Sequence, residues 1–245
     1  MSLSCGVLIV HGLTATPATM APAIEAMEDA GYAVSAPMLP GHGTTEHDLE
    51  QTTWREWATA VQEAYAELAT RVNHIYYMGL SLGALLGLYL AEQHPQKLRA
   101  LALLGTPLHL SPLVRRIVPV VRYSPVRWIY TASQKDWKTS VADPDGLEVY
   151  KESSYTRIPT KAVYQVYDLE QVVEKQLGQI RTPILLAHSH LDETAPASNV
   201  AALQRHIHNP TPEVMWCDKS YHVLTLDYDR DAINQAVLKF FERNS

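Results

Sequence analysis

The chain has 245 residues, of which 47% are hydrophobic and 19% are charged, and its formal net charge is -6 at pH 7. This composition is typical of a globular protein with a substantial core, and it excludes a disordered chain. The acidic balance and the lack of any run of basic residues exclude nucleic acid as an expected partner.

The first hundred residues alternate between apolar strands and amphipathic helices. Short apolar runs predict strands at Cys5 to Val10, Ala33 to Ala36, His74 to Met78 and Leu98 to Leu104. Helices are expected from Pro17 to Gly31, from Trp54 to Leu68, where apolar residues recur at helical spacing, and from the turn at Ser81 to roughly Gln93. The first strand follows no basic segment or cleavage site and is too short to span a bilayer, so we expect a soluble cytoplasmic protein without an integral membrane segment. Cys5 and Cys217 are expected to be buried thiols in two strands.

The alternation stops between residues 107 and 167. Six prolines interrupt this segment, which has no clear strand but contains short helical stretches at Leu113 to Val121 and Val126 to Tyr130. We interpret it as a helical cap of residues 107–167, inserted after the fourth strand into a core of residues 1–106 and 168–245. Its apolar residues either pack the cap onto the core, line an acyl pocket or touch a lipid surface: Leu108, Leu110, Leu113, Ile117, Val118, Trp128 and Ile129.

Strands and helices alternate again in the last third of the chain. Strands are predicted at Pro183 to His188 and Glu213 to Cys217, and helices near Ser198 to His208 and about Asp229 to Phe241. Repeated strand-helix units predict an α/β fold with a mostly parallel, doubly wound sheet of about six strands. Such sheets bind ligands at the carboxyl ends of their strands, so the loops that follow the strands are the candidate site.

The loop after the third strand carries Gly79-Leu80-Ser81-Leu82-Gly83. A Gly-x-Ser-x-Gly sequence between a strand and a helix is typical of a sharp turn that exposes the serine hydroxyl above the sheet. The glycines suit places where strand and helix pass too closely for a Cβ atom. Alone, the motif is also compatible with a serine that only caps the helix.

Two further loops supply an acid and a base. Asp192 follows the fifth strand and His222 follows the sixth, so the chain order is serine, aspartate, histidine, as in α/β-hydrolases. A serine needs an imidazole to take its proton, and the imidazole needs a carboxylate to orient it. Glu193 competes with Asp192 for this role, whereas Asp218 and Asp227 lie on the same loop as His222 and suit it less.

Four other histidines have simpler explanations than catalysis. His11 and His42 lie in turn-rich loops, where we expect structural hydrogen bonds. His188 and His190 lie near Asp192, but no further ligand follows at a usual spacing, so we expect no metal site.

Several motifs together resemble the α/β-hydrolases of the bacterial carboxylesterase and monoacylglycerol lipase branch. They are His11-Gly12-Leu13-Thr14, Pro40-Gly41-His42-Gly43, Gly79 to Gly83, Leu191-Asp192-Glu193 and Tyr221-His222-Val223-Leu224. They occur in the family's order in both halves of the core, while the cap resembles the family less. We expect the sheet to lack the two leading strands of longer members, a difference that leaves the catalytic positions untouched.

The resemblance implies a serine esterase that needs no cofactor. Ser81, Asp192 and His222 would form its triad, and the backbone amides of Leu13 and Leu82 its oxyanion hole. The expected partner is a small-molecule ester with an apolar acyl chain, of short to medium length or a monoacylglycerol. A thioesterase, an acyltransferase or a carbon-carbon bond hydrolase could use the same triad, and a catalytically silent protein that binds an apolar ligand is the alternative from another class. Nothing in the sequence predicts the oligomeric state.

Overall fold

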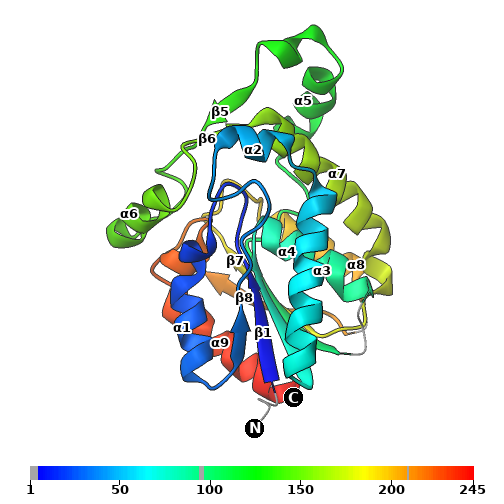
Figure 1. Ribbon diagram of the computed structural model, residues 1–245, viewed down its shortest axis with the longest axis vertical. Helices are drawn as coiled ribbons and strands as arrows, with labels where there is room; N and C mark the ends of the chain where they lie inside the picture. Colours follow the sequence, from blue (N-terminus) through cyan, green and yellow to red (C-terminus); the bar gives the residue numbers. More distant parts are fainter. Residues whose placement is uncertain (1–4, 94–96, 209) are drawn as a thin grey trace.

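The computed structural model describes residues 5–93, 97–208 and 210–245. Its centre is a sheet of six parallel strands in the spatial order β2-β1-β3-β4-β7-β8 (Figure 1). The strands are β1 (Cys5–Val10), β2 (Ala33–Ser35), β3 (His74–Leu80), β4 (Leu98–Leu104), β7 (Ile184–Ser189) and β8 (Glu213–Cys217). The predicted sheet is confirmed, with small shifts at the strand ends.

The register of the strands determines where the functional loops meet. At the carboxyl edge, Val10 of β1 pairs with Gly79 of β3, and Ser189 of β7 pairs with Cys217 of β8. Because parallel strands all end at the same edge, the loops that follow them gather there. This edge faces the insertion at the top of Figure 1.

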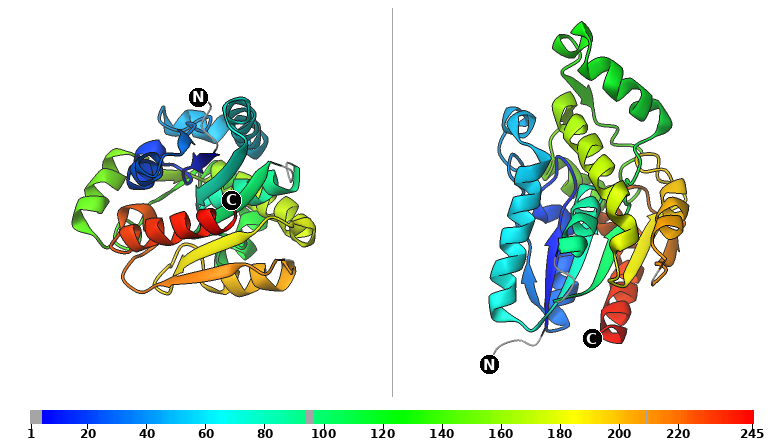
Figure 2. Two further views of the ribbon diagram at one scale, coloured as in Figure 1. Left: turned by 90° about the horizontal axis from the view of Figure 1, so that it is seen from below. Right: turned by 90° about the vertical axis from the view of Figure 1, so that its right-hand side faces the viewer.

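Helices cover both faces of the sheet (Figures 1 and 2). One face carries α1 (Ala21–Asp29) and α9 (Arg230–Arg243), and the other carries α3 (Trp54–Arg71), α4 (Leu82–Gln93) and α8 (Ser198–His206). The apolar stripes of these helices form two hydrophobic clusters, one against each face. A capping box, in which the Thr53 and Glu56 side chains bond each other's backbone amides, starts α3.

The insertion between β4 and β7 combines helices with a small second sheet. It contains α5 (Pro112–Arg122), η2 (Pro125–Trp128), β5 (Ala132–Gln134), α6 (Pro144–Glu152), β6 (Arg157–Pro159) and α7 (Thr160–Gln176), with η3 (Leu177–Gln179) leading back to the core. Its place after β4 and its helices agree with the predicted cap. The expected lack of strands was wrong, because β5 and β6 pair antiparallel. Strands of three residues are too short to show alternation in a sequence.

Other short elements were also not predicted. The first helix is split into η1 (Pro17–Met20) and α1, while α2 (Glu46–Gln51) and η4 (Leu224–Leu226) occupy loops. The predicted cap boundary at residue 167 falls inside α7, whose buried residues Leu169 and Val173 join the core cluster beside α4. Cys217 is buried as expected, whereas Cys5 is partly exposed at the start of β1.

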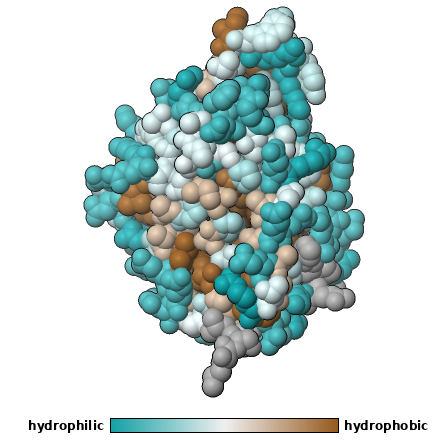
Figure 3. Space-filling view, viewed as in Figure 1, coloured by the Kyte–Doolittle hydropathy of each residue, from teal (hydrophilic) through white to brown (hydrophobic). Residues whose placement is uncertain are grey.

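The outer end of the insertion presents apolar side chains to solvent (Figure 3). Trp128 and Ile129 are 70% and 86% exposed there. Across the described parts of the chain, no helix combines the length and the apolar character that crossing a bilayer would require.

Candidate active site

Ser81 occupies the sharp turn between β3 and α4. Its φ angle is 54°, in the left-handed region that non-glycine residues rarely adopt. A Cβ atom on Gly83 would lie 2.2 Å from the Val10 carbonyl oxygen, and one on Gly79 would lie 2.5 Å from the Gly83 backbone. The two glycines therefore let α4 pack directly against β3 and β1, which holds the turn in this conformation.

His222 connects Ser81 with Asp192. Its Nε2 lies 3.0 Å from Ser81 Oγ, and its Nδ1 lies 2.8 Å from Asp192 Oδ2. A carboxylate only accepts hydrogen bonds, so Nδ1 carries the ring proton and Nε2 is left to accept the serine proton. The structure thus brings together the three residues that the sequence singled out, from the loops after β3, β7 and β8.

Asp192 is held in its ionised form. The backbone amides of Thr194 and Ala195 both donate to its Oδ1 at 2.8 Å. Burial opposes ionisation, but the bonds from His222 and from the Ala195 amide outweigh it, and the pKa of Asp192 lies below its ordinary value. Glu193, the competing carboxylate, is exposed to solvent.

Gly105, directly after β4, is a site residue that was not predicted from the sequence. Its φ angle is 52°, and a Cβ atom there would lie 3.3 Å from Nδ1 of His222. The glycine therefore gives the imidazole room beside the end of β4. The signal in the sequence was Gly105-Thr106-Pro107, a turn sequence that follows a predicted strand.

Asp227 also has a function that was not predicted. It is fully buried, and its carboxylate accepts the backbone amides of Tyr221, Ala142 and Asp143. It therefore fixes the His222 loop and attaches this loop to the insertion. By contrast, Asp218 is exposed and lies near His190 at the surface.

The other histidines make structural contacts. Nδ1 of the buried His11 donates to the Gly12 carbonyl and its Nε2 accepts from the Leu39 amide, while burial lowers its pKa to about 3. His42 donates to the Pro40 carbonyl. His188 donates to the Ala195 carbonyl, with a pKa lowered by burial.

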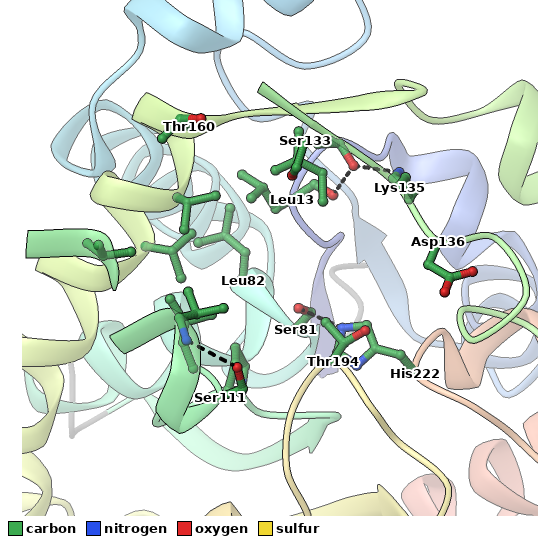
Figure 4. Close-up of a pocket in the computed structure, with 18 of the residues that line it drawn as sticks. Leu13, Ser81, Leu82, Ser111, Ser133, Lys135, Asp136, Thr160, Thr194 and His222 are labelled. Atoms are coloured by element: carbon green, nitrogen blue, oxygen red, sulfur yellow. Dashed lines mark hydrogen bonds between the residues drawn. The ribbon is translucent and has the colours of Figure 1, made fainter. Parts of the chain in front are cut away.

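A cavity of about 500 Å³ opens between the core and the insertion, with Ser81 and His222 in its wall (Figure 4). Leu13 and Leu82, the expected oxyanion residues, also line it, and Thr14 beside Leu13 has a φ angle of 66°. Apolar side chains of the insertion form much of the remaining wall, among them Leu110, Val114, Ile117, Val118, Val163 and Val166.

The structure places the apolar residues of the insertion in different environments, for which the sequence left packing, an acyl pocket or lipid contact open. Leu110, Leu113, Ile117 and Val118 line the cavity, Leu108 is packed in the core, and Trp128 and Ile129 are exposed. Packing of the insertion onto the core therefore does not explain all of these apolar residues, because four of them line the cavity.

The chain is similar in sequence to known proteins. The family model described as serine aminopeptidase, S33, matches residues 4–229. The chain is 34% identical to a thermostable monoacylglycerol lipase of Bacillus sp. (strain H-257), over 98% of this chain and 91% of that protein. It is 24% identical to a carboxylesterase of Bacillus subtilis (strain 168), over 97% of this chain and 92% of that one.

The chain is also similar to a solved structure, described under the name of LipS and LipT, two metagenome-derived lipolytic enzymes. The two structures superpose with a TM-score of 0.88 at 26% sequence identity. The match covers 99% of this chain and 95% of the other. On its sequence, its six-stranded parallel sheet and its serine turn, the chain belongs to the serine aminopeptidase S33 family of α/β-hydrolases.

Proposed function

We propose that the protein is a serine esterase that hydrolyses carboxylic esters through an acyl-enzyme on Ser81. The observation that carries this proposal is the hydrogen-bonded series Ser81, His222 and Asp192, which opens onto a largely apolar cavity. The names of the relatives, a monoacylglycerol lipase and a carboxylesterase, support the ester as the substrate class.

In the first half of the proposed reaction, His222 Nε2 takes the hydroxyl proton as Ser81 Oγ bonds to the carbonyl carbon of the ester. The carbonyl oxygen becomes an anion, and the amides of Leu13 and Leu82 are the proposed donors to it. Leu82 begins α4, so the positive end of the helix adds to this stabilisation. The bond to the alcohol oxygen then breaks, and His222 gives its proton to the departing alcohol.

Water completes the reaction. His222 takes a proton from a water molecule, whose oxygen attacks the acyl-enzyme carbonyl at the same oxyanion site. Collapse of this second intermediate returns the proton to Ser81 and releases the carboxylic acid. Asp192 remains ionised and holds the ring in one tautomer throughout. These steps use protein groups and water alone, so the proposal includes no cofactor or metal.

The apolar part of the cavity is the proposed acyl site. Val114, Val118 and Val166 contribute to this wall, which comes from α5 and α7. A hydrocarbon chain gains free energy when it leaves water for such a surface, at about 0.8 kcal/mol for each buried methylene group. We therefore propose short to medium acyl chains, or a monoacylglycerol, as the substrate. Location in the cytoplasm stays a prediction from the sequence.

The test combines covalent labelling with kinetics. An organophosphonate probe should modify Ser81 in the wild-type protein, as located by mass spectrometry, and Ser81→Ala should remove the label. The same substitution should lower ester turnover by roughly a million-fold, the scale of losing a triad nucleophile. Matched thioester and amide substrates distinguish esterase activity from the other uses of the triad. An unlabelled Ser81 would favour the silent binding protein instead, and Ser81→Ala activity within about tenfold of wild type would contradict the mechanism.

A further inference from the structure

One buried cation in the cavity has no role in the proposed mechanism. Lys135 follows β5 in the insertion, is only 8% exposed, and lines the same cavity as Ser81 (Figure 4). Its Nζ donates to Thr14 Oγ1 at 2.7 Å. It also lies 4.4 Å from the ring centroid of Tyr150 and 5.0 Å from that of Trp137.

Among residues 5–93, 97–208 and 210–245, no carboxylate oxygen lies within the 4.0 Å salt-bridge limit of Lys135 Nζ. Two carboxylates line the cavity, those of Asp136 and Glu193; both residues are exposed to water, and Asp136 accepts the Lys138 amide. Taking an ammonium group out of water costs several kcal/mol unless an anion compensates it. Burial accordingly lowers the pKa of Lys135 to about 7.

The aromatic rings compensate this cost in part. A ring face attracts a cation by about 0.5 to 2 kcal/mol, which is less than a desolvated ion pair provides. An ammonium group has three N–H donors, and Thr14 is the one hydrogen-bond acceptor found for it in the described parts of the chain. The remaining donors are free to bind a ligand group that enters the cavity.

The position of Lys135 indicates which part of a substrate it would meet. In Figure 4, Ser81 lies between the side of the cavity that carries Ser111 and the side that carries Lys135 and Asp136. The Ser111 side adjoins the apolar wall of α5, because Ser111 is the residue that caps this helix. An acyl chain in the apolar wall therefore directs the alcohol portion of the ester toward Lys135.

We propose that Lys135 is the centre of an anion subsite, and that the preferred esters carry a phosphate or carboxylate group on their alcohol portion. The inference rests on the proposed esterase function and adds a specificity-determining residue to it. An oxyanion in this pocket would accept the free N–H donors of Lys135 and restore the stabilisation that the ammonium group lost on leaving water. The covalent steps remain those of ester hydrolysis, and the released alcohol keeps the anionic group.

The contact with Thr14 gives Lys135 a second, structural effect that the experiment must separate. The backbone of Thr14 has a left-handed conformation, and its Oγ1, which accepts from Lys135, donates to the Leu13 carbonyl. Loss of the lysine would therefore disturb the proposed oxyanion loop for every substrate. Lys135→Gln keeps a hydrogen-bond donor but removes the charge, and Lys135→Met removes both. Lys138→Met is the matched control, because it removes an exposed lysine from the same segment.

The measurement is kcat/KM for three esters with one acyl chain: decanoylglycerol, decanoylglycerol phosphate and decanoylglycerate. We expect the wild type to hydrolyse at least one anionic ester as efficiently as the neutral one. In Lys135→Gln and Lys135→Met, the anionic-to-neutral ratio should fall by about tenfold or more, the value of a charge-assisted hydrogen bond. Lys138→Met should keep the wild-type ratio. A structural role alone would lower all three rates together and leave the ratio unchanged.

The outcomes also separate this inference from the function on which it rests. Turnover of the neutral ester with rejection of both anionic esters would overturn the anion subsite and leave the esterase intact. An anionic-to-neutral ratio of kcat/KM that is equal in the wild type and both Lys135 variants would overturn the anion subsite as well. Failure to hydrolyse any ester would contradict the proposed function itself. Whichever anionic ester responds to Lys135 identifies phosphate or carboxylate as the preferred group.

Discussion

Asp192 and Glu193 are neighbours in the sequence, but their carboxylates lie in different environments. Asp192 is buried and accepts hydrogen bonds from His222 and from two backbone amides, while Glu193 is exposed at the cavity wall. Residue type alone could not separate two adjacent acids. Side-chain length and the turn from Asp192 to Ala195 decide which of them reaches the imidazole.

Exchange of each acid for its amide tests this difference. Asp192→Asn should lower kcat by about 10⁴-fold, because an amide in place of the carboxylate favours the wrong tautomer of His222. Glu193→Gln should change kcat by less than about threefold, since its side chain has no part in the hydrogen-bonded series. Steady-state kinetics on one ester gives both values. The opposite ranking would mean that Glu193 is the acid of the triad.

Glu170 of α7 is a buried acid away from the triad. Its Oε1 accepts the Leu110 amide at 2.8 Å, and its Oε2 is among the buried atoms without a partner in the described structure. Burial raises the pKa of Glu170 to about 8 from 4.5. The Glu170 carboxyl therefore stays protonated in the folded protein up to about pH 8, whereas in the unfolded chain it ionises above about pH 4.5. The folded state consequently loses stability as the pH rises between these two pKa values.

Glu170→Gln should consequently stabilise the protein in alkaline solution. The gain in the free energy of unfolding should be negligible near pH 4.5 and should reach the order of 5 kcal/mol above pH 8. The amide keeps an oxygen for the Leu110 amide but cannot ionise. Denaturant unfolding at the two ends of this range measures the difference, with the exposed Glu148→Gln as the control. A gain that is independent of pH would refute the linkage to ionisation.

At the scale of elements, the turn between β3 and α4 depends on close approach of backbones. Helix α4 is apolar on all sides and is mostly buried, because it lies between the sheet on one side and α3 and α7 on the other. The sequence predicted this element well, because a buried strand, a glycine-flanked serine and an apolar helix follow one another without interruption. Local pattern was sufficient there.

Gly83→Ala should therefore damage the fold as well as the site. The new Cβ atom would meet the Val10 carbonyl oxygen at 2.2 Å, and neither backbone can move without shifting β1 or α4. We expect a loss of about 3 kcal/mol in the free energy of unfolding. Gly178→Ala is the matched control, because its Cβ atom would find its nearest neighbour at 3.9 Å. Equal stability of the two variants in thermal unfolding would contradict the packing argument.

At the scale of the whole molecule, the cavity exists only where the core and the insertion meet. Ser81 and His222 come from the core, whereas α5 and the first turns of α7 supply the apolar wall. Asp227 reinforces this junction, because it binds the amides of Ala142 and Asp143 in the insertion and that of Tyr221 in the core. The length of the acyl chain is therefore expected to depend on the insertion.

Val114→Trp tests this dependence, since a larger side chain on α5 would occupy part of the acyl wall. The substitution should lower kcat/KM for decanoyl esters by about tenfold or more, and change that for acetyl esters by less than about threefold. A series of ester chain lengths, measured on the wild type and on the variant, gives the comparison. Equal losses at all lengths would place the acyl chain elsewhere.

The sequence by itself determined the six strands, most of the core helices and the order of Ser81, Asp192 and His222 on three loops. These features follow from local rules, because apolar runs, glycines and turn residues act over a few neighbours. Only the tertiary structure decided that Asp192 faces His222, that Gly105 makes room for the ring, and that Lys135 is buried beside Thr14. Those contacts join residues distant in sequence, so they depend on strand register and on the path of the insertion, which no local pattern specifies.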